Sequence, residues 1–155
     1  MSTRYGFTLF EVLIALLILS IGLLGLAALF TSGMKSNHGA YMRTQATLLA
    51  YDMADRMRAN ATGVANGDYD SISATPPGSH PQCATSSSTT ASDCTPQQIA
   101  IFDHYQWDKE LQTLLPHGQG TVAKQANSPN YLITVMWDGN QTGSANTQFQ
   151  TTFRP

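Results

Sequence analysis

One carboxylate lies at the start of a long apolar segment near the N-terminus. Glu11 is followed by 19 residues without a charge, from Val12 to Phe30, and the next charged residue is Lys35. A carboxylate is costly in the interior of a bilayer, so Glu11 is a candidate functional residue that needs a partner. The alternative is a simple anchor in which Glu11 is a tolerated charge at the membrane interface.

The residues before Glu11 suggest the partner. No small-x-small cleavage pattern follows the apolar segment, as it would in a secretory signal peptide, and the only junction that looks suitable for cleavage is Gly6-Phe7. Cleavage there would keep the apolar segment on the mature protein. It would also create a free amine on Phe7, four positions before Glu11.

Metal and enzyme chemistry have little support in the sequence. A Cys2His2 set could be drawn from His80, Cys83, Cys94 and His104, but the spacing is not that of paired zinc ligands, and oxidised cysteines do not bind zinc. The chain has no G-x-S-x-G motif and no Gly-rich phosphate loop after a predicted strand. We therefore expect no enzyme activity, no metal and no cofactor.

Two pairs of titratable residues on a later predicted helix also give no indication of catalysis. Asp103 and His104 are sequence neighbours, and neighbouring side chains on a helix do not face one another. Asp108 and Glu110 are expected to lie on a solvated face of the same helix.

The element that must position Glu11 is a long helix. The uncharged segment would rise about 28 Å as a helix, enough to cross the hydrocarbon of a bilayer. The first proline is at position 76, and we expect a helix over residues 7–60 with a membrane-spanning part at about 12–34. Such a helix would be about 80 Å long, so its first half should protrude from a compact domain.

Small residues gather on one face of the membrane-spanning part. They fall within an arc of roughly 140° at 100° per residue. This spacing predicts a face on which helices pack closely in lipid, although glycine is also common in such helices for other reasons. The residues are Ala15, Gly22, Gly25, Ala28 and Ser32, and the face continues through Ser36 and Gly39.

The rest of the chain predicts one small α+β body. Apolar residues at spacings of three and four form a stripe on the long helix: Met42, Ala46, Leu49, Met53 and Met57. Asp52 and Arg56 are placed to form a surface ion pair. Residues 61–92 are rich in Gly, Ser, Thr and Pro and predict an irregular, mobile surface loop, which extends to Cys94.

After this loop the elements are well marked. Thr95-Pro96-Gln97-Gln98 is a capping box that opens a second helix, which Pro116 should end. Alternating residues predict strands at 121–124, 131–137 and 147–153. These strands could form an antiparallel sheet that packs on the stripe of the long helix.

The N-terminal sequence Gly6-Phe7-Thr8-Leu9-Phe10-Glu11 before an apolar helix resembles the signal of type IV prepilins and type II secretion pseudopilins. The resemblance implies that a prepilin peptidase cuts after Gly6 and that the new N-terminal Phe7 is methylated. It also implies a role for Glu11 in assembly. Phe10 stands where many members have Ile or Leu.

The resemblance also sets the compartment. It implies a cytoplasmic N-terminus in the inner membrane and a periplasmic body, which later becomes part of a pilus at the cell surface. In that oxidising space Cys83 and Cys94, with ten residues between them, predict a disulfide. The net charge is −2 and charged residues make up 12% of the chain, so nucleic acid is not an expected partner.

Three further segments narrow the resemblance to the PilV-type minor pilins of type IV pili. They are IGLLGLAAL in the apolar helix, DMADRMRAN near its end, and CTPQQIAIFDHYQWDKELQTLLPHGQG. The resemblance implies a low-abundance subunit that primes pilus assembly with other minor pilins and the major pilin, at the pilus tip. Two alternatives remain: a tip adhesin that contacts a surface through loop 61–94, and a minor pseudopilin of a type II secretion system.

Overall fold

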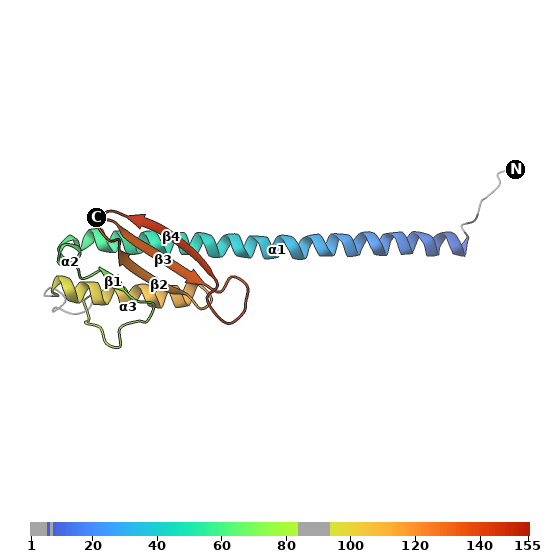
Figure 1. The fold of residues 1–155 in the computed structure, drawn as a ribbon. Helices are drawn as coiled ribbons and strands as arrows, with labels where there is room; N and C mark the ends of the chain where they lie inside the picture. Colours follow the sequence, from blue (N-terminus) through green and yellow to red (C-terminus); the bar gives the residue numbers. More distant parts are fainter. Residues whose placement is uncertain (1–5, 7, 84–93) are drawn as a thin grey trace. The chain divides into compact units, whose positions relative to one another are not determined.

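The computed structural model describes residue 6, residues 8–83 and residues 94–155 (Figure 1). The chain divides into two compact units, residues 1–40 and residues 41–155. We refer to the second unit as the body. The helices and strands, in chain order, are α1 (Leu9–Ala59), α2 (Ala61–Asn66), β1 (Ser71–Ile72), α3 (Pro96–Leu114), β2 (Gln119–Lys124), β3 (Tyr131–Trp137) and β4 (Thr147–Phe153).

The first unit consists of the N-terminal part of α1. The helix starts after Thr8, whose carbonyl and hydroxyl oxygens both accept hydrogen bonds from the Glu11 amide, at 3.1 and 3.3 Å. By length and composition this part of the helix could cross a membrane, and none of the apolar stretch is buried within the chain. The hydroxyls of Ser20 and Thr31 donate to helix carbonyls of Leu17 and Ala27, so these polar groups are satisfied inside the helix itself.

The body is an α+β fold, as the sequence predicts. Its sheet has the order β1-β2-β3-β4, and all three neighbouring pairs are antiparallel. The three predicted strands are confirmed, although β2 begins two residues earlier than expected. Helix α3 opens with the predicted capping box at Thr95 and Gln98, with proline in its first turn.

The predicted stripe on α1 forms one side of the hydrophobic core. Met53 and Met57 are fully buried, and they share the core with Ile133 and Val135 of β3. The stripe is confirmed because every one of its members is buried: Met42, Ala46, Leu49, Met53 and Met57.

Trp107 of α3 is the largest fully buried side chain. Its indole nitrogen donates a 2.8 Å hydrogen bond to the carbonyl of Leu49, which joins α3 to α1. Gly120 of β2 lies directly against the indole, since a Cβ at this position would lie 2.2 Å from Trp107 Cη2. Gly118 lies equally close to α3, with the position of a Cβ only 2.1 Å from the Leu111 carbonyl oxygen. Close packing therefore requires glycine at both positions.

The prediction of an irregular loop from residue 61 is wrong for its first twelve residues. Asn60 ends α1 and caps α2 by accepting a 3.1 Å hydrogen bond from the Gly63 amide, and Gly67 closes α2 in the left-handed conformation. Tyr69 and Ile72 are buried in the core, and β1 adds a fourth strand beside β2. The few apolar residues of this segment are buried because they pack against residues far away in the sequence, which its overall polarity does not reveal. Residues 84–93 of the predicted loop lie outside the described residues.

Candidate functional site

Glu11 lies in the first turn of α1 and is exposed. Its carboxylate makes no hydrogen bond or ion pair with any other residue that the structure describes. The first-turn position is electrostatically favourable, because the free amides at a helix N-terminus attract negative charge. Phe7, the expected partner, lies outside the described residues, so the pairing of its amine with Glu11 stays a prediction.

The small residues of α1 leave open space beside the helix. A Cβ at Gly22 or Gly25 would meet no atom within 4 Å, and the same holds at Gly33 and Gly39. Contacts within the described part of the chain therefore do not require glycine at these positions. Large apolar side chains around them, such as Leu24 and Phe30, are more than two-thirds exposed. A segment of this kind can be buried only by lipid or by another protein.

Arg56 joins α1 to α3 in the body. Its guanidinium forms ion pairs with Asp52 at 2.6 Å and with Glu110 at 3.0 Å, and it lies 3.8 Å from Asp103. The predicted Asp52–Arg56 pair is confirmed, but the two partners on α3 could not be predicted from the sequence. Because the arginine side chain is only about one-fifth exposed, this cluster is part of the packing between the helices.

A buried polar network continues from Arg56. The Tyr69 hydroxyl donates a 2.5 Å hydrogen bond to Asp103, and the Asn60 side-chain amide donates to the Tyr69 oxygen at 3.1 Å and to the Pro96 carbonyl at 2.8 Å. Burial raises the pKa of Asp103, and the Tyr69 and Arg56 contacts partly oppose this increase. Burial also raises the pKa of Tyr69. The network ties the junction of α1 and α2 to the start of α3.

Asp108 differs from its predicted place on a solvated face. It is 5% exposed and accepts a 2.5 Å hydrogen bond from the Gln112 side chain, and burial raises the pKa of its carboxyl group. Glu110, its predicted companion, is partly exposed and pairs with Arg56. The prediction was wrong for Asp108 because burial here comes from neighbouring segments. The helix pattern alone does not show them.

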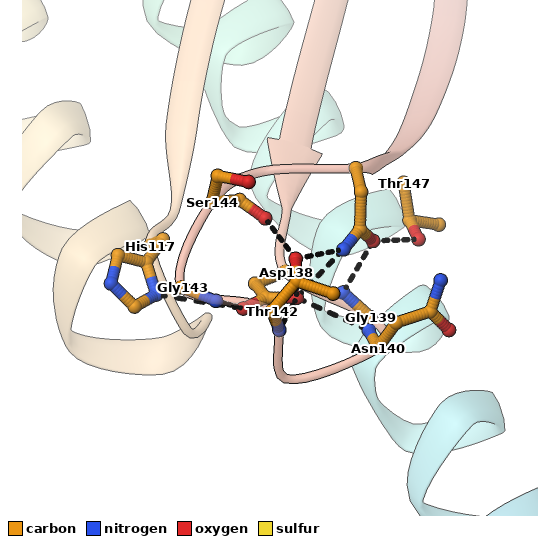
Figure 2. Close-up of polar contacts among 9 residues, drawn as sticks. His117, Asp138, Gly139, Asn140, Thr142, Gly143, Ser144 and Thr147 are labelled. Atoms are coloured by element: carbon orange, nitrogen blue, oxygen red, sulfur yellow. Dashed lines mark hydrogen bonds and ion pairs between the residues drawn. The ribbon is translucent and has the colours of Figure 1, made fainter.

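Asp138 organises the loop that follows β3 (Figure 2). One carboxylate oxygen accepts backbone hydrogen bonds from Asn140 at 3.2 Å and Thr142 at 3.0 Å, and one from the Asn146 side chain at 2.8 Å. The other accepts the Gly143 amide at 2.6 Å. These bonds, with the Thr142 amide first, lower the pKa of Asp138 to about 2. Both oxygens are thus taken up by hydrogen-bond donors, and the side chain holds the loop.

Models of protein families match two adjoining parts of the chain. A model described as Tt1218-like, type IV pilin Tt1218, matches residues 28–105. A second, the prokaryotic N-terminal methylation motif, matches residues 1–27. The chain belongs to the Tt1218-like type IV pilin family. Comparison with curated proteins and with solved structures finds no significant match.

Family membership explains why the apolar N-terminal part of α1 is exposed in this pilin. Type IV pilins are processed by a prepilin peptidase and assemble with other pilins, and the methylation motif with the apolar helix fits a membrane-anchored subunit that later enters a pilus. The family is a structural one, and the polar clusters of the body join its helices and hold the loop after β3.

The pilin has the expected disulfide. Cys83 and Cys94 are bonded, with their Cα atoms 5.8 Å apart. This bond removes the Cys2His2 alternative, since both sulfurs are used, and His80 instead stacks on the Tyr105 ring with 3.5 Å between the ring centres. Among the residues that the structure describes, no group of three His, Cys, Asp or Glu side chains could hold a metal ion.

The Asp138 loop is the polar site that sequence reasoning missed in this pilin. A usable signal was present, because an aspartate followed by Asn140, Thr142 and Gly143 offers backbone amides in a short loop to its own side chain.

Proposed function

We propose that this pilin is a PilV-type minor pilin that helps to prime assembly of a type IV pilus. It acts in a complex with other minor pilins, at the pilus tip, and contacts the major pilin below it. The observation that carries the proposal is the exposed apolar segment of α1, with the carboxylate of Glu11 at its start and no ion-pair partner for it among the described residues. Family membership supports the pilus as the assembly in which this segment is buried.

The proposed maturation starts in the inner membrane. Residues 1–6 form a leader that prepilin peptidase removes between Gly6 and Phe7, and the new amine of Phe7 is methylated. Residues 7–60 form the spine, with about 12–34 in the membrane, and residues 61–155 belong to the periplasmic side. Because the N-terminus remains cytoplasmic, the body faces the periplasm until the subunit enters the pilus.

Glu11 provides the proposed contact between subunits. The carboxylate of one chain neutralises the Phe7 amine of a neighbour, since an ion pair is much less costly in low dielectric than either charge alone. This pairing sets the axial register of two helices. They then approach along the small-residue face, where the open space at Gly22 and Gly25 admits a second helix.

The assignment to the PilV type is supported by the segment that ends in LLPHGQG. Gly118 and Gly120 of this segment are both needed for close packing, against Leu111 and Trp107. The segment that resembles PilV-type minor pilins therefore includes two glycines that the packing of the body requires.

The test is Glu11→Ala in a strain in which it is the only copy. Cleavage, membrane insertion and folding of the body should be unchanged, because the Glu11 side chain makes no hydrogen bond or ion pair with any other described residue. Pilus number and cross-linking to other minor pilins should fall, and Glu11→Asp should be intermediate because the charge remains but its reach shortens. Asp55→Ala is the control, since this acidic residue of α1 is 71% exposed and its ion pair within the described part of the chain is a surface pair with Arg58.

Two outcomes contradict the proposal. Full piliation with unchanged cross-links at equal protein level would indicate that Glu11 is only a tolerated charge at the membrane interface. Mass spectrometry of sheared pili that finds this chain as the most abundant subunit would contradict the minor role.

A further inference from the structure

The sheet of the body ends in a long edge strand. All seven residues of β4 pair with β3, from Trp137–Thr147 to Tyr131–Phe153. β4 is the last strand in the sheet order, and no backbone hydrogen bond from residues 148–153 to anything other than β3 occurs in the described part of the chain. In an antiparallel strand, about half of the backbone groups point away from the partner. The outer edge of β4 therefore presents a row of unpaired amides and carbonyls.

This edge lacks the usual protection against pairing. Proteins protect exposed edges with charged residues, proline, bulges or very short strands. The sequence of β4, TQFQTTF, has no charge and no proline, and its register with β3 is unbroken. The opposite edge differs, since β1 has only two residues and lies next to the ion pair of Asp70 with Lys124 at 3.2 Å.

The hydrophobic core is also incomplete at β4. Phe153 is 3% exposed and packs against Tyr131, with the guanidinium of Arg58 4.8 Å from its ring centre. Phe149, which lies on the same side of the strand, packs on the core but is only partly buried. An additional strand beside β4 would place a side chain next to Phe149 on this face and cover it.

We propose that the outer edge of β4 binds an extended strand from a neighbouring, different pilin subunit. Its backbone pairs with the free amides and carbonyls, and its apolar residues at alternate positions cover Phe149. The inference rests on the proposed function, because it names the surface of the body through which this subunit joins the pilus complex. The partner should be a polypeptide segment in extended conformation, because the amides and carbonyls on the outer edge of β4 are complementary to those of another extended backbone.

A second copy of this chain is the less suitable partner. Antiparallel pairing of two β4 strands would rotate one body by half a turn about the normal of the sheet. This rotation would reverse the part of α1 that packs against the sheet (Figure 1). Subunits inserted in the same membrane by their N-terminal segments keep their helices in the same direction, so this pairing does not fit the assembly.

The first experiment measures amide hydrogen exchange in β4 for the full-length chain in detergent and in assembled pili. We expect the amides of residues 148–153 that exchange in detergent to become protected in pili. A photo-cross-linking residue at Gln148, which is exposed, should form a cross-link to an extended segment of another subunit that carries a prepilin signal. Unprotected β4 amides in pili would overturn the inference, and so would cross-links only to β4 of a second copy.

The second experiment places charges on the edge. Gln148→Lys with Thr152→Lys adds two lysines at exposed positions of β4, and we expect about tenfold less incorporation into pili, the effect of losing ~1.4 kcal/mol of binding. The control adds two lysines at exposed positions near the other edge, Ser71→Lys with Ala123→Lys. Equal incorporation of both variants, at equal melting temperature, would overturn the inference. Absence of the unmodified chain from pili would instead contradict the proposed function.

Discussion

The close approach of Gly120 to Trp107 gives a prediction that tests the packing of the body. In Gly120→Ala the new Cβ would lie 2.2 Å from Cη2 and 2.4 Å from Cζ3 of the indole. Carbon atoms in contact normally lie about 3.5–4.0 Å apart, so the indole must move by more than 1 Å, roughly the difference. Trp107 is completely buried, and protein interiors are close-packed, so this movement must displace neighbouring core residues.

The cost follows from two effects of that movement. Overpacking a core typically costs about 1–3 kcal/mol. Displacement also weakens the 2.8 Å hydrogen bond from Trp107 to the Leu49 carbonyl, which is worth about 0.5–1.5 kcal/mol. The gain from replacing glycine in a strand offsets only about 0.5–1 kcal/mol. We expect a net loss of about 2–3 kcal/mol, which should lower the melting temperature by about 10 °C in a body of this size.

The assay is thermal unfolding of the full-length protein in detergent, followed by near-UV circular dichroism. Gly78→Ala is the matched control, because no atom lies within 4 Å of its Cβ position, and its melting temperature should be unchanged. In the double variant with Trp107→Phe the smaller ring leaves room for the new methyl group, so the two losses should not add. A melting temperature of Gly120→Ala equal to that of the wild type, or strictly additive losses, would refute the reasoning.

Three further predictions concern other sites. The pKa of Asp138 is lowered to about 2, so the contribution of its carboxylate to stability should be complete above about pH 4 and should be lost as the pH falls towards 2. The urea midpoint of the wild type should fall over this pH range, and that of Asp138→Asn should lack this decrease. An identical decrease in both proteins would contradict the assignment. Replacing both Cys83 and Cys94 by serine should reduce stability by about 3 kcal/mol in denaturant unfolding, from the loop they close, and a change near zero would argue against this estimate. The intact mass of the mature protein should correspond to a chain that starts at Phe7 with one added methyl group, and a mature chain that starts at Met1 would exclude cleavage.

The sequence was most informative where the relevant interactions are local. The α3 capping box depends on residues three positions apart, and the stripe on α1 depends on the period of one helix, so both could be predicted. The alternation in β3 and β4 likewise gave their bounds correctly. For the candidate site, the position of Glu11 at the start of an apolar helix also came from local sequence.

The sequence was least informative where segments far apart meet. Tyr69 and Ile72 lie in a polar segment, and their contacts with α3 and β2 help to make α2 and β1 part of the body. Asp108 has the same helical spacing as a solvated residue, and neighbouring segments bury it.

The amino-acid sequence by itself thus determined the long helix, the lone carboxylate at its start, the capped second helix and the main strands, because each depends on residues within a few positions of one another. Only the tertiary structure decided that Arg56 of α1 pairs with Glu110 of α3 and that Gly120 makes room for Trp107. It also decided that β4 is the exposed edge of the sheet. The physical reason is that burial, close approach and strand order depend on which distant segments pack together, and that information is not contained in any single stretch of the chain.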